Sequence, residues 1–378
     1  MKPPPARVPL VDLAPQHAEI GDEALAAVGA LARGGKFILG EPVLRFEQLL
    51  AKMVGAAHAV GVASGTDALV LALAAAGVRP GDLVVVPAVT FAATAEAVVR
   101  AGGEPLFVEP DPSTFCLTPT GVRARIEALP ASDRTRVRAV VPVHLFGRAC
   151  DMQGLAAVAA EHRLAIVEDA AQALGGRTVG KALGTFGVAG AYSFFPTKNL
   201  GAWGDSGAVV TDRDDVAARV RSLRQHGVEG GRFTALGMNS RLDAVQAAVL
   251  AVKAPRLEGW TRARIAAGER YRSLLAGALP EGALLQDAGG DGEHVYHQLV
   301  VRVAGREAFQ QRLAERGIET RAYYTRPLYA EEAFARYASA GDDAGRSIAG
   351  TLVALPMFYG ITEAQQRSVA DAVRDASR

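Results

Sequence analysis

Apolar runs and amphipathic runs alternate along the first 250 residues of the chain. Nearly continuous apolar stretches predict strands at residues 58–64, 83–90, 105–111, 138–146, 164–171, 189–195 and 207–212. Between them, apolar positions with a helical period predict helices at residues 65–77, 93–102, 151–163 and 215–227. Buried strands that alternate with helices are typical of a mostly parallel sheet covered on both faces. The pattern therefore predicts an α/β fold.

After Leu242 the pattern becomes strongly helical. Residues 242–278 have the periodicity of amphipathic helices, interrupted near Pro255, and a glycine-rich loop follows at residues 280–294. The rest of the chain mixes both patterns, with strands predicted at residues 296–303 and 318–324 and helices at residues 306–317 and 362–377. This second part therefore has an α+β pattern.

Length and composition limit the class of protein. A chain of 378 residues is long for one domain, and we predict a large α/β domain at residues 1–255 and a smaller α+β domain at residues 256–378. A hydrophobic content of 49% with 21% charged residues is typical of a globular protein. The formal net charge is +1 and no basic block occurs, so we expect neither nucleic acid nor an anionic membrane as a partner.

The same survey bears on the cellular location. The chain opens without an apolar signal core and contains no run of about 18 apolar residues, which predicts no membrane segment. Cys116 and Cys150 are the only cysteines, and their spacing matches no metal motif. We therefore expect no metal centre and a reducing, cytoplasmic setting.

A candidate anion site lies where the first predicted strand meets its helix. Ser64 is a plausible N-cap, and the free N–H groups at a helix start attract phosphate, which Gly65 would allow to approach closely. We assign the contact to Gly65 and Thr66, because Asp67 would repel a phosphate. An ordinary capping box of Ser64 with Asp67 explains the same residues equally well.

Other motifs in the chain are excluded by their context. No GxGxxG follows a strand, and GGRTVGKA at residues 175–182 carries Ala182 where a P-loop needs Ser or Thr. GDSG around Ser206 and GAAHAV around His58 resemble trypsin-like protease motifs. Those enzymes are paired β-barrels, which the alternating pattern does not allow. We therefore interpret Ser206 as a small residue in a tight turn.

Two ionisable residues follow strands of the predicted sheet. Asp169 ends an apolar strand, where α/β folds place ligand-binding groups, and its neighbour Glu168 should point to the opposite face. Asp169 would keep a basic ring nitrogen protonated, or it would cap a helix at residues 170–174. Lys198 follows another apolar strand, and a lysine in a partly dry pocket has a lowered pKa and a nucleophilic amine. Ser193 offers a hydroxyl to a phosphate.

These elements together specify a cofactor. Pyridoxal 5′-phosphate needs a phosphate cradle, an amine for its aldehyde and an acid for its ring nitrogen. The chain supplies them in the order phosphate site, Asp169, Lys198 on an α/β scaffold. The sequence therefore predicts a protein that binds pyridoxal phosphate.

Six segments carry a specific resemblance to a known family: ASGTDAL, VPAVTFAATAEAV, VPVHLFG, VEDAAQALGG, SFFPTKNLGAWGDSGAVVT and MNSRLDAVQAAVL. Together with VPLVDLAPQ near the start, the chain resembles the DegT/DnrJ/EryC1/StrS family along nearly its whole length. The resemblance implies a fold-type-I enzyme that depends on pyridoxal phosphate, with a mostly parallel seven-stranded sheet and a smaller C-terminal domain. It also implies amination of keto-sugars attached to nucleotides.

The resemblance implies roles for individual residues. Lys198 would bind the cofactor's aldehyde and shuttle protons, and Asp169 would face the ring nitrogen. The remaining cofactor contacts would come from Gly65, Thr66, Phe91, Gln172, Ser193 and Asn239. Gln172 would lie near the phenolic oxygen and Phe91 would stack on the ring, although Phe91 could also be a core residue. Asn239 would reach the phosphate of a neighbouring subunit, so the resemblance implies a homodimer with shared active sites.

The resemblance also implies a substrate. VPLVDLAPQ and TRAYYTRPLY are similar to the branch that aminates C3 of dTDP-linked 3-keto-6-deoxyhexoses, with glutamate as the usual amino donor. Tyr323, Tyr324 and Arg326 would contact the nucleotide or sugar, or pack at a domain edge. Tyr329 stands where many relatives have histidine. A C4 aminotransferase, a sugar dehydratase and a silent regulatory or scaffold protein remain as alternatives, although Lys198 is intact and dehydratases of the family tend to replace it.

Overall fold

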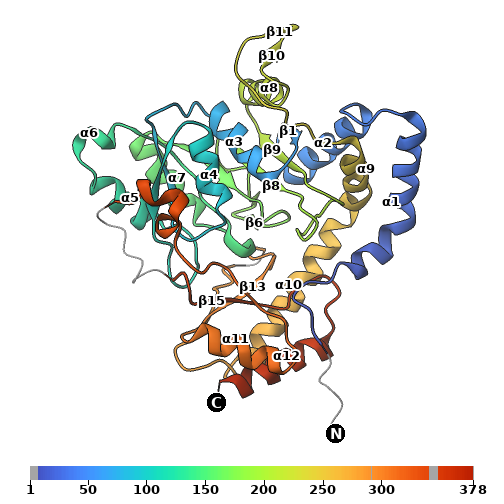
Figure 1. Ribbon diagram of the computed structural model, residues 1–378, viewed down its shortest axis with the longest axis vertical. Helices are drawn as coiled ribbons and strands as arrows, with labels where there is room; N and C mark the ends of the chain where they lie inside the picture. The colour runs from blue at the N-terminus through green and yellow to red at the C-terminus, as the bar shows by residue number, and fades with distance from the viewer. Residues whose placement is uncertain (1–6, 291, 340–347, 378) are drawn as a thin grey trace.

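The computed structural model describes residues 7–290, 292–339 and 348–377. Within them, seven strands form one sheet in the order β1-β9-β8-β5-β4-β2-β3 (Figure 1). Only β9 runs antiparallel to its neighbours, so the predicted mostly parallel sheet is confirmed. Its strands are β1 His58–Val62, β2 Leu83–Pro87, β3 Glu104–Val108, β4 Val137–Val140, β5 Ala165–Asp169, β8 Ala189–Ser193 and β9 Gly207–Thr211.

Helices cover both faces of this sheet. Side chains alternate along each strand, so Val84 and Val86 of β2 pack in one core while Leu83 and Val85 pack in another. The first core contains α3, α4 and α8, and the opposite face is covered by α5 and α7 and, farther along the sheet, by α1, α2 and α9. The helices of this part are α1 Ala14–Gly34, α2 Glu41–Val54, α3 Gly65–Ala75, α4 Ala93–Arg100, α5 Pro119–Glu127, α6 Ala131–Arg134, α7 Met152–His162, α8 Asp214–Leu223 and α9 Ala244–Lys253.

A second sheet forms the core of the smaller domain. It has the order β12-β13-β15-β14, and helices α11 and α12 lie beside it at the bottom of the view in Figure 1. The helices and strands of this domain are α10 Leu257–Leu275, β12 Leu284–Leu285, β13 Leu299–Arg302, α11 Arg306–Glu315, β14 Arg321–Ala322, β15 Leu352–Leu355 and α12 Glu363–Ala376. The predicted α+β pattern is therefore present after residue 256.

Residues from each side of position 256 also pack in the core on the other side. Val8 pairs with Ile318 and packs in the small-domain core, although it stands near the start of the chain. Two short 3-10 helices, η3 Leu328–Ala330 and η4 Glu332–Tyr337, pack against Phe107 of the large domain. The break near Pro255 is the 3-10 turn η2 Ala254–Arg256, after which α10 continues.

One predicted possibility is wrong. The structure has turns at residues 170–175 in place of the helix that Asp169 would have capped. The segment from 175 to 182 forms a small hairpin of β6 Arg177–Thr178 and β7 Lys181–Ala182, as expected for a sequence that is not a P-loop. A second hairpin, β10 Val228–Glu229 and β11 Arg232–Phe233, projects at the top of Figure 1.

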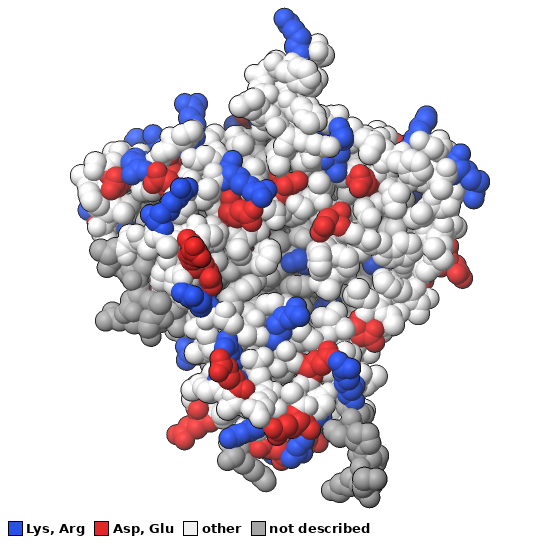
Figure 2. Space-filling model, in the orientation of Figure 1, with Lys and Arg blue, Asp and Glu red and all other residues white. Residues whose placement is uncertain are grey.

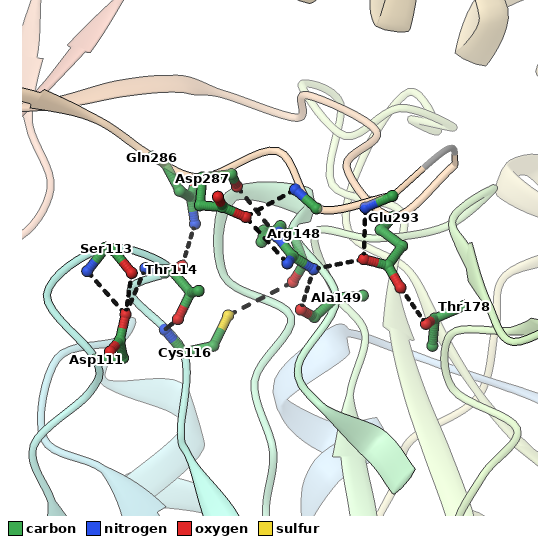
Figure 3. Close-up of polar contacts among 12 residues, drawn as sticks. Asp111, Ser113, Thr114, Cys116, Arg148, Ala149, Thr178, Gln286, Asp287 and Glu293 are labelled. Atoms are coloured by element: carbon green, nitrogen blue, oxygen red, sulfur yellow. Dashed lines mark hydrogen bonds and ion pairs between the residues drawn. The ribbon is translucent and has the colours of Figure 1, made fainter. Parts of the chain in front are cut away.

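Arg148 joins the two domains. It follows the 3-10 turn η1 Leu145–Gly147, and its guanidinium contacts Asp287 at 3.2 Å and Glu293 at 3.3 Å on the glycine-rich loop (Figure 3). Gln286 extends the same junction, because its amide donates to the carbonyl of Thr114 at 2.7 Å. These contacts hold the loop that leads into β13 against the large domain.

The surface carries charges of both signs. On the face shown in Figure 2, lysine and arginine side chains are interspersed with aspartate and glutamate. In the part of the chain that the structure describes, every helix is too short or too polar to cross a bilayer. Three or more potential metal ligands do not gather anywhere among these residues.

Candidate active site

A cavity of about 500 Å³ is lined by residues at or after the carboxyl ends of large-domain strands and by residues of the small domain. Apart from Asn239 and Arg326, every residue predicted from the sequence lines it: Gly65, Thr66, Phe91, Asp169, Gln172, Ser193, Lys198, Tyr323 and Tyr324. Parallel strands end at one edge of a sheet, so residues that follow different strands meet there. The cavity therefore gathers the predicted chemistry in one place.

The start of α3 forms one end of the cavity. Ser64 caps this helix, because its Oγ accepts from the Asp67 N–H at 3.1 Å, while Ser240 donates to the Asp67 carboxylate at 2.7 Å. The N–H groups of Gly65 and Thr66 precede the first intrahelical bond and have no partner within the helix. A Cβ on Gly65 would lie 2.6 Å from the Cβ of Ser193, so only glycine fits there. The cap leaves the N–H groups of Gly65 and Thr66 available to an anion, and Ser240 engages the carboxylate of Asp67.

Asp169 is buried at the end of β5. Its carboxylate accepts from the Thr94 hydroxyl at 2.8 Å and from the Ala171 N–H at 3.2 Å. Burial raises the pKa of Asp169, whereas these two hydrogen bonds and the charge of Lys198 act in the opposite direction. A buried carboxylate without a full counter-charge is stabilised by a cation placed beside it. The site therefore favours a protonated ring nitrogen.

Glu168 points to the other face of β5, as predicted. It is fully buried and accepts from the N–H groups of Gly184 at 2.8 Å and Gly187 at 3.0 Å, and it contacts His144 Nε2 at 3.1 Å. These contacts occupy the carboxylate completely with structural partners. The alternation of a β-strand thus separates a structural acid from a site acid in adjacent positions.

Lys198 lies in the loop between β8 and β9 and faces Asp169 across the cavity. Burial lowers the pKa of Lys198 from 10.5 to about 8, and the charge of Asp169 opposes this shift only in part. A substantial fraction of the side chain is therefore a neutral amine near neutral to mildly alkaline pH. The predicted lowered pKa is confirmed in direction.

Aromatic side chains close another side of the cavity. Phe91 is 59% exposed, so the interpretation as a core residue is wrong. Its ring centroid lies 6.4 Å from that of Tyr324, which also stacks on Phe146 at 6.4 Å. Gln172 accepts from the Phe146 N–H at 2.5 Å and lines the same wall. These residues form an apolar wall in which a flat ring can be held.

Two predicted residues lie outside this cavity. Asn239 is exposed, forms a backbone bridge with Gln225 and does not line the cavity. Arg326 is exposed, and its guanidinium donates to the carbonyl of Ala330. The structure of the single chain thus does not bring either residue to Lys198, and both assignments stay predictions.

The structure adds residues that the sequence did not indicate. Thr94 orients Asp169, and its signal was its position at the start of α4, the helix that follows β2. His297, Gln298 and Arg321 line the cavity from the small domain. Arg321 lies in the segment TRAYYTRPLY, but its place in the cavity, like that of His297 and Gln298, depends on how the second sheet packs on the first.

The cavity fits pyridoxal phosphate. The N–H groups of Gly65 and Thr66 at the helix start suit the phosphate, Asp169 suits the ring nitrogen, and Lys198 suits the aldehyde. The phosphate cradle is narrow, because the backbone of Gly65 approaches Ser193 without room for another side chain. The fold and this cavity together are those of a cofactor-dependent α/β enzyme.

Comparison with known proteins gives the family. The model of the DegT/DnrJ/EryC1/StrS aminotransferase family matches residues 18–374. The chain is 39% identical to the dTDP-3-amino-3,4,6-trideoxy-alpha-D-glucose transaminase of Streptomyces venezuelae, over 98% of this chain and 96% of the relative. It is also 39% identical to the pleiotropic regulatory protein of Geobacillus stearothermophilus, over 98% and 99%. The crystal structure of S. venezuelae DesV, in complex with a ketimine intermediate, superimposes with a TM-score of 0.92 at 39% identity and covers both chains fully.

The chain belongs to the DegT/DnrJ/EryC1/StrS aminotransferase family, and its cofactor is pyridoxal 5′-phosphate. The predicted fold class and cofactor are therefore confirmed. The individual residue roles rest on the geometry described above.

The pKa of Lys198 predicts how fast the cofactor-free protein captures pyridoxal phosphate. Only the neutral amine attacks an aldehyde, so the rate should rise about tenfold per pH unit below pH 8 and level off above it. An ordinary lysine with a pKa of 10.5 would continue to gain rate up to about pH 10. Stopped-flow growth of the visible Schiff-base band between about pH 6 and pH 10 measures this profile. A rate still rising steeply at pH 10 would contradict the lowered pKa.

Proposed function

We propose that this protein transfers an amino group from an amino acid, with L-glutamate as the donor, to a keto-sugar attached to a nucleotide. The observation that carries the proposal is the placement of Lys198 opposite the buried Asp169 in one cavity. The name of the S. venezuelae relative, a dTDP-sugar transaminase, supports the substrate class. We further propose C3 of a dTDP-linked 3-keto-6-deoxyhexose as the acceptor position.

The residues divide the chemical work. Pyridoxal phosphate, when bound, withdraws electrons from the reacting carbon of the donor. Lys198, with its lowered pKa, would take a proton from that carbon in the donor half-reaction and would give a proton to the acceptor's carbon in the second half-reaction, which is the task of a general base and acid near its own pKa. Asp169 holds positive charge on the ring nitrogen, and Thr94 with the Ala171 N–H fixes the orientation of its carboxylate. The buried pair thus supplies both proton transfer and charge stabilisation.

Binding and exclusion of water fall to the other cavity residues. The helix start at Gly65 and Thr66, together with the Ser193 hydroxyl, holds the phosphate. Phe91 and Tyr324 provide apolar surface against the ring and limit access of water to Lys198. A drier cavity strengthens the interaction between Asp169 and a cationic ring.

We propose that two copies of the chain share their active sites. On the projecting hairpin and the segment after it, Phe233 is 78% and Leu236 99% exposed, which is unusual for large apolar side chains on a monomer. Asn239 follows directly and is also exposed, so burial of this segment against a second copy would carry its amide toward the other cavity. A solution mass of a single chain in light scattering would contradict the dimer.

We infer a cytoplasmic location, since both cysteines are buried free thiols. The partners we propose are the nucleotide-linked keto-sugar and the amino-acid donor, without nucleic acid or membrane. Fractionation of cells that produce the protein tests the location, because export would place it outside the cytoplasmic fraction.

A regulatory role is the second candidate, because one relative is named a pleiotropic regulatory protein. The intact Lys198 and Asp169 weigh against a silent scaffold and against a dehydratase.

One experiment separates these functions. Protein loaded with pyridoxal phosphate is mixed with L-glutamate, and the visible band is followed together with formation of 2-oxoglutarate. We expect the band to fall as the cofactor gains the amino group, and to return when a dTDP-linked 3-keto-6-deoxyhexose is added. The absence of any shift with a panel of amino acids would favour the scaffold. A return only with a 4-keto-sugar would contradict the C3 assignment.

A further inference from the structure

Arg321 is a cation in the cavity without an ionic partner. It stands on β14, the edge strand of the small-domain sheet, and lines the cavity that contains Lys198. No carboxylate in residues 7–290, 292–339 or 348–377 forms an ion pair with it, and its neighbour is the Tyr323 ring, with the guanidinium carbon 6.0 Å from the centroid. Other arginines of this protein do have acidic partners, such as Arg136 with Glu104 and Arg148 with Asp287. An unpaired guanidinium in a cavity is a candidate anion site.

Two other polar side chains of this cavity each have an atom without a hydrogen-bond partner among the described residues. His297 is only 7% exposed, and its Nδ1 has no hydrogen-bond partner. Gln298 follows it, and its Oε1 is buried without a partner. Both residues line the cavity and stand directly before β13. Strand β15 lies between β13 and β14, the strand that carries Arg321. Buried polar atoms are rarely left unsatisfied, so this wall of the cavity is built to receive a polar group.

The charges in the cavity indicate which polar group. Asp169 faces Lys198, and the phosphate end is formed by the start of α3 in the large domain. Asp205 lines the cavity as an exposed carboxylate from the loop before β9. Burial and the nearby charges of Lys198 and Arg264 hold the pKa of His297 well below its usual value, so this imidazole is neutral. Arg321 is therefore the permanent cation that the small domain contributes.

We propose that Arg321 binds a carboxylate of the amino-acid donor. This inference rests on the proposed aminotransferase function, because that reaction brings an amino acid to Lys198. The planar guanidinium matches a carboxylate with two parallel hydrogen bonds. Arg321 is exposed at its end of the cavity, where it can meet the amino-acid donor as it approaches Lys198. A nucleotide diphosphate is the competing anion, and the test distinguishes the two.

The test compares Arg321→Gln with the wild type in the two half-reactions. We expect the L-glutamate concentration for half-maximal rate of the donor half-reaction to rise about 10–100-fold, the usual effect of losing a charged hydrogen bond. The maximal rate should change less, because Lys198 and Asp169 are intact. Affinity for dTDP and the rate with the keto-sugar should stay within about twofold. A primary amine without a carboxylate should react equally with both proteins.

Two further variants control this comparison. Arg302→Gln removes a guanidinium from β13 of the same sheet, outside the cavity, and should leave the glutamate dependence unchanged. Arg321→Lys keeps the charge without the planar fork and should fall between the wild type and Arg321→Gln. An unchanged Schiff-base band and melting temperature in each variant show that the fold and the cofactor site persist.

The possible outcomes distinguish a failure of the inference about Arg321 from a failure of the proposed aminotransferase function. Weakened dTDP binding with an unchanged glutamate dependence would assign Arg321 to the nucleotide and overturn the inference. Unchanged behaviour in both half-reactions would overturn it as well. Failure of the wild-type protein itself to react with any amino acid would instead overturn the proposed function.

Discussion

Replacing Lys198 by alanine should abolish transamination and remove the visible Schiff-base band of the protein. The alanine has no amine to bind the cofactor's aldehyde and no group to move the proton, so both steps lose the same side chain. We expect the overall rate to fall by at least about 10⁴-fold, to the background of the assay. The measurements are the absorption spectrum after gel filtration and the formation of 2-oxoglutarate from L-glutamate.

A surface lysine provides the control for this variant. Lys52 on α2 is exposed and lies outside the cavity, so Lys52→Ala should keep both the band and the activity. If Lys198→Ala retained an undiminished visible band, another amine would hold the cofactor, and the role assigned to Lys198 would be wrong. Adding a small primary amine should restore part of the band to Lys198→Ala, because the rest of the cavity is unaltered.

Replacing Asp169 by asparagine should lower the maximal rate of the donor half-reaction by about 10²–10⁴-fold. Asparagine has nearly the same shape and can still accept the hydrogen bond from Thr94, but it carries no charge. The ring nitrogen then loses the anion that keeps it protonated, and the cofactor becomes a weaker electron acceptor. Stopped-flow decay of the visible band after addition of L-glutamate measures the effect.

The control for Asp169→Asn is the same substitution at an aspartate outside the cavity that has only a structural role. Asp151 caps α7 by accepting from the Gly154 N–H at 2.9 Å, so Asp151→Asn should leave the half-reaction rate unchanged. Asparagine is itself a good N-cap, and the fold should persist. A half-reaction of wild-type speed in Asp169→Asn would show that the carboxylate does not act on the ring. A loss of cofactor binding without a spectral change in the bound fraction would assign Asp169 to affinity alone.

The strands and helices of the large domain could be predicted because their patterns are local. Residues 83–90 and 164–171 are nearly continuous apolar runs, and both became central strands, β2 and β5. The ends were less accurate: β2 stops at Pro87, and the segment predicted as a helix at residues 170–174 forms turns. An alanine-rich sequence favours a helix locally. Residues 170–175 instead form turns, in which the Ala171 N–H donates to the Asp169 carboxylate.

Part of the cofactor site was visible in the sequence for a similar reason. Gly65, Asp169, Ser193 and Lys198 each stand at the end of a strand or a few residues after it, and a parallel sheet brings such positions together at one edge. The role of Phe91 could not be predicted from the sequence alone, because an aromatic residue among apolar neighbours has the same local pattern in a core and at a cavity. Its 59% exposure decided the question.

The sequence by itself determined the order of strands and helices, the face of β5 on which Asp169 lies and the residues available for a cofactor, since these depend on periodicity and on residue type. Tertiary structure alone decided that Arg321, His297 and Gln298 share a cavity with Lys198, and that Arg326 does not. The reason is that the small domain reaches the cavity through packing between residues that are more than 90 positions apart, as with Asn199 and the carbonyl of Val295. Neither the pKa of Lys198 near 8 nor the unpaired charge of Arg321 exists before that packing forms.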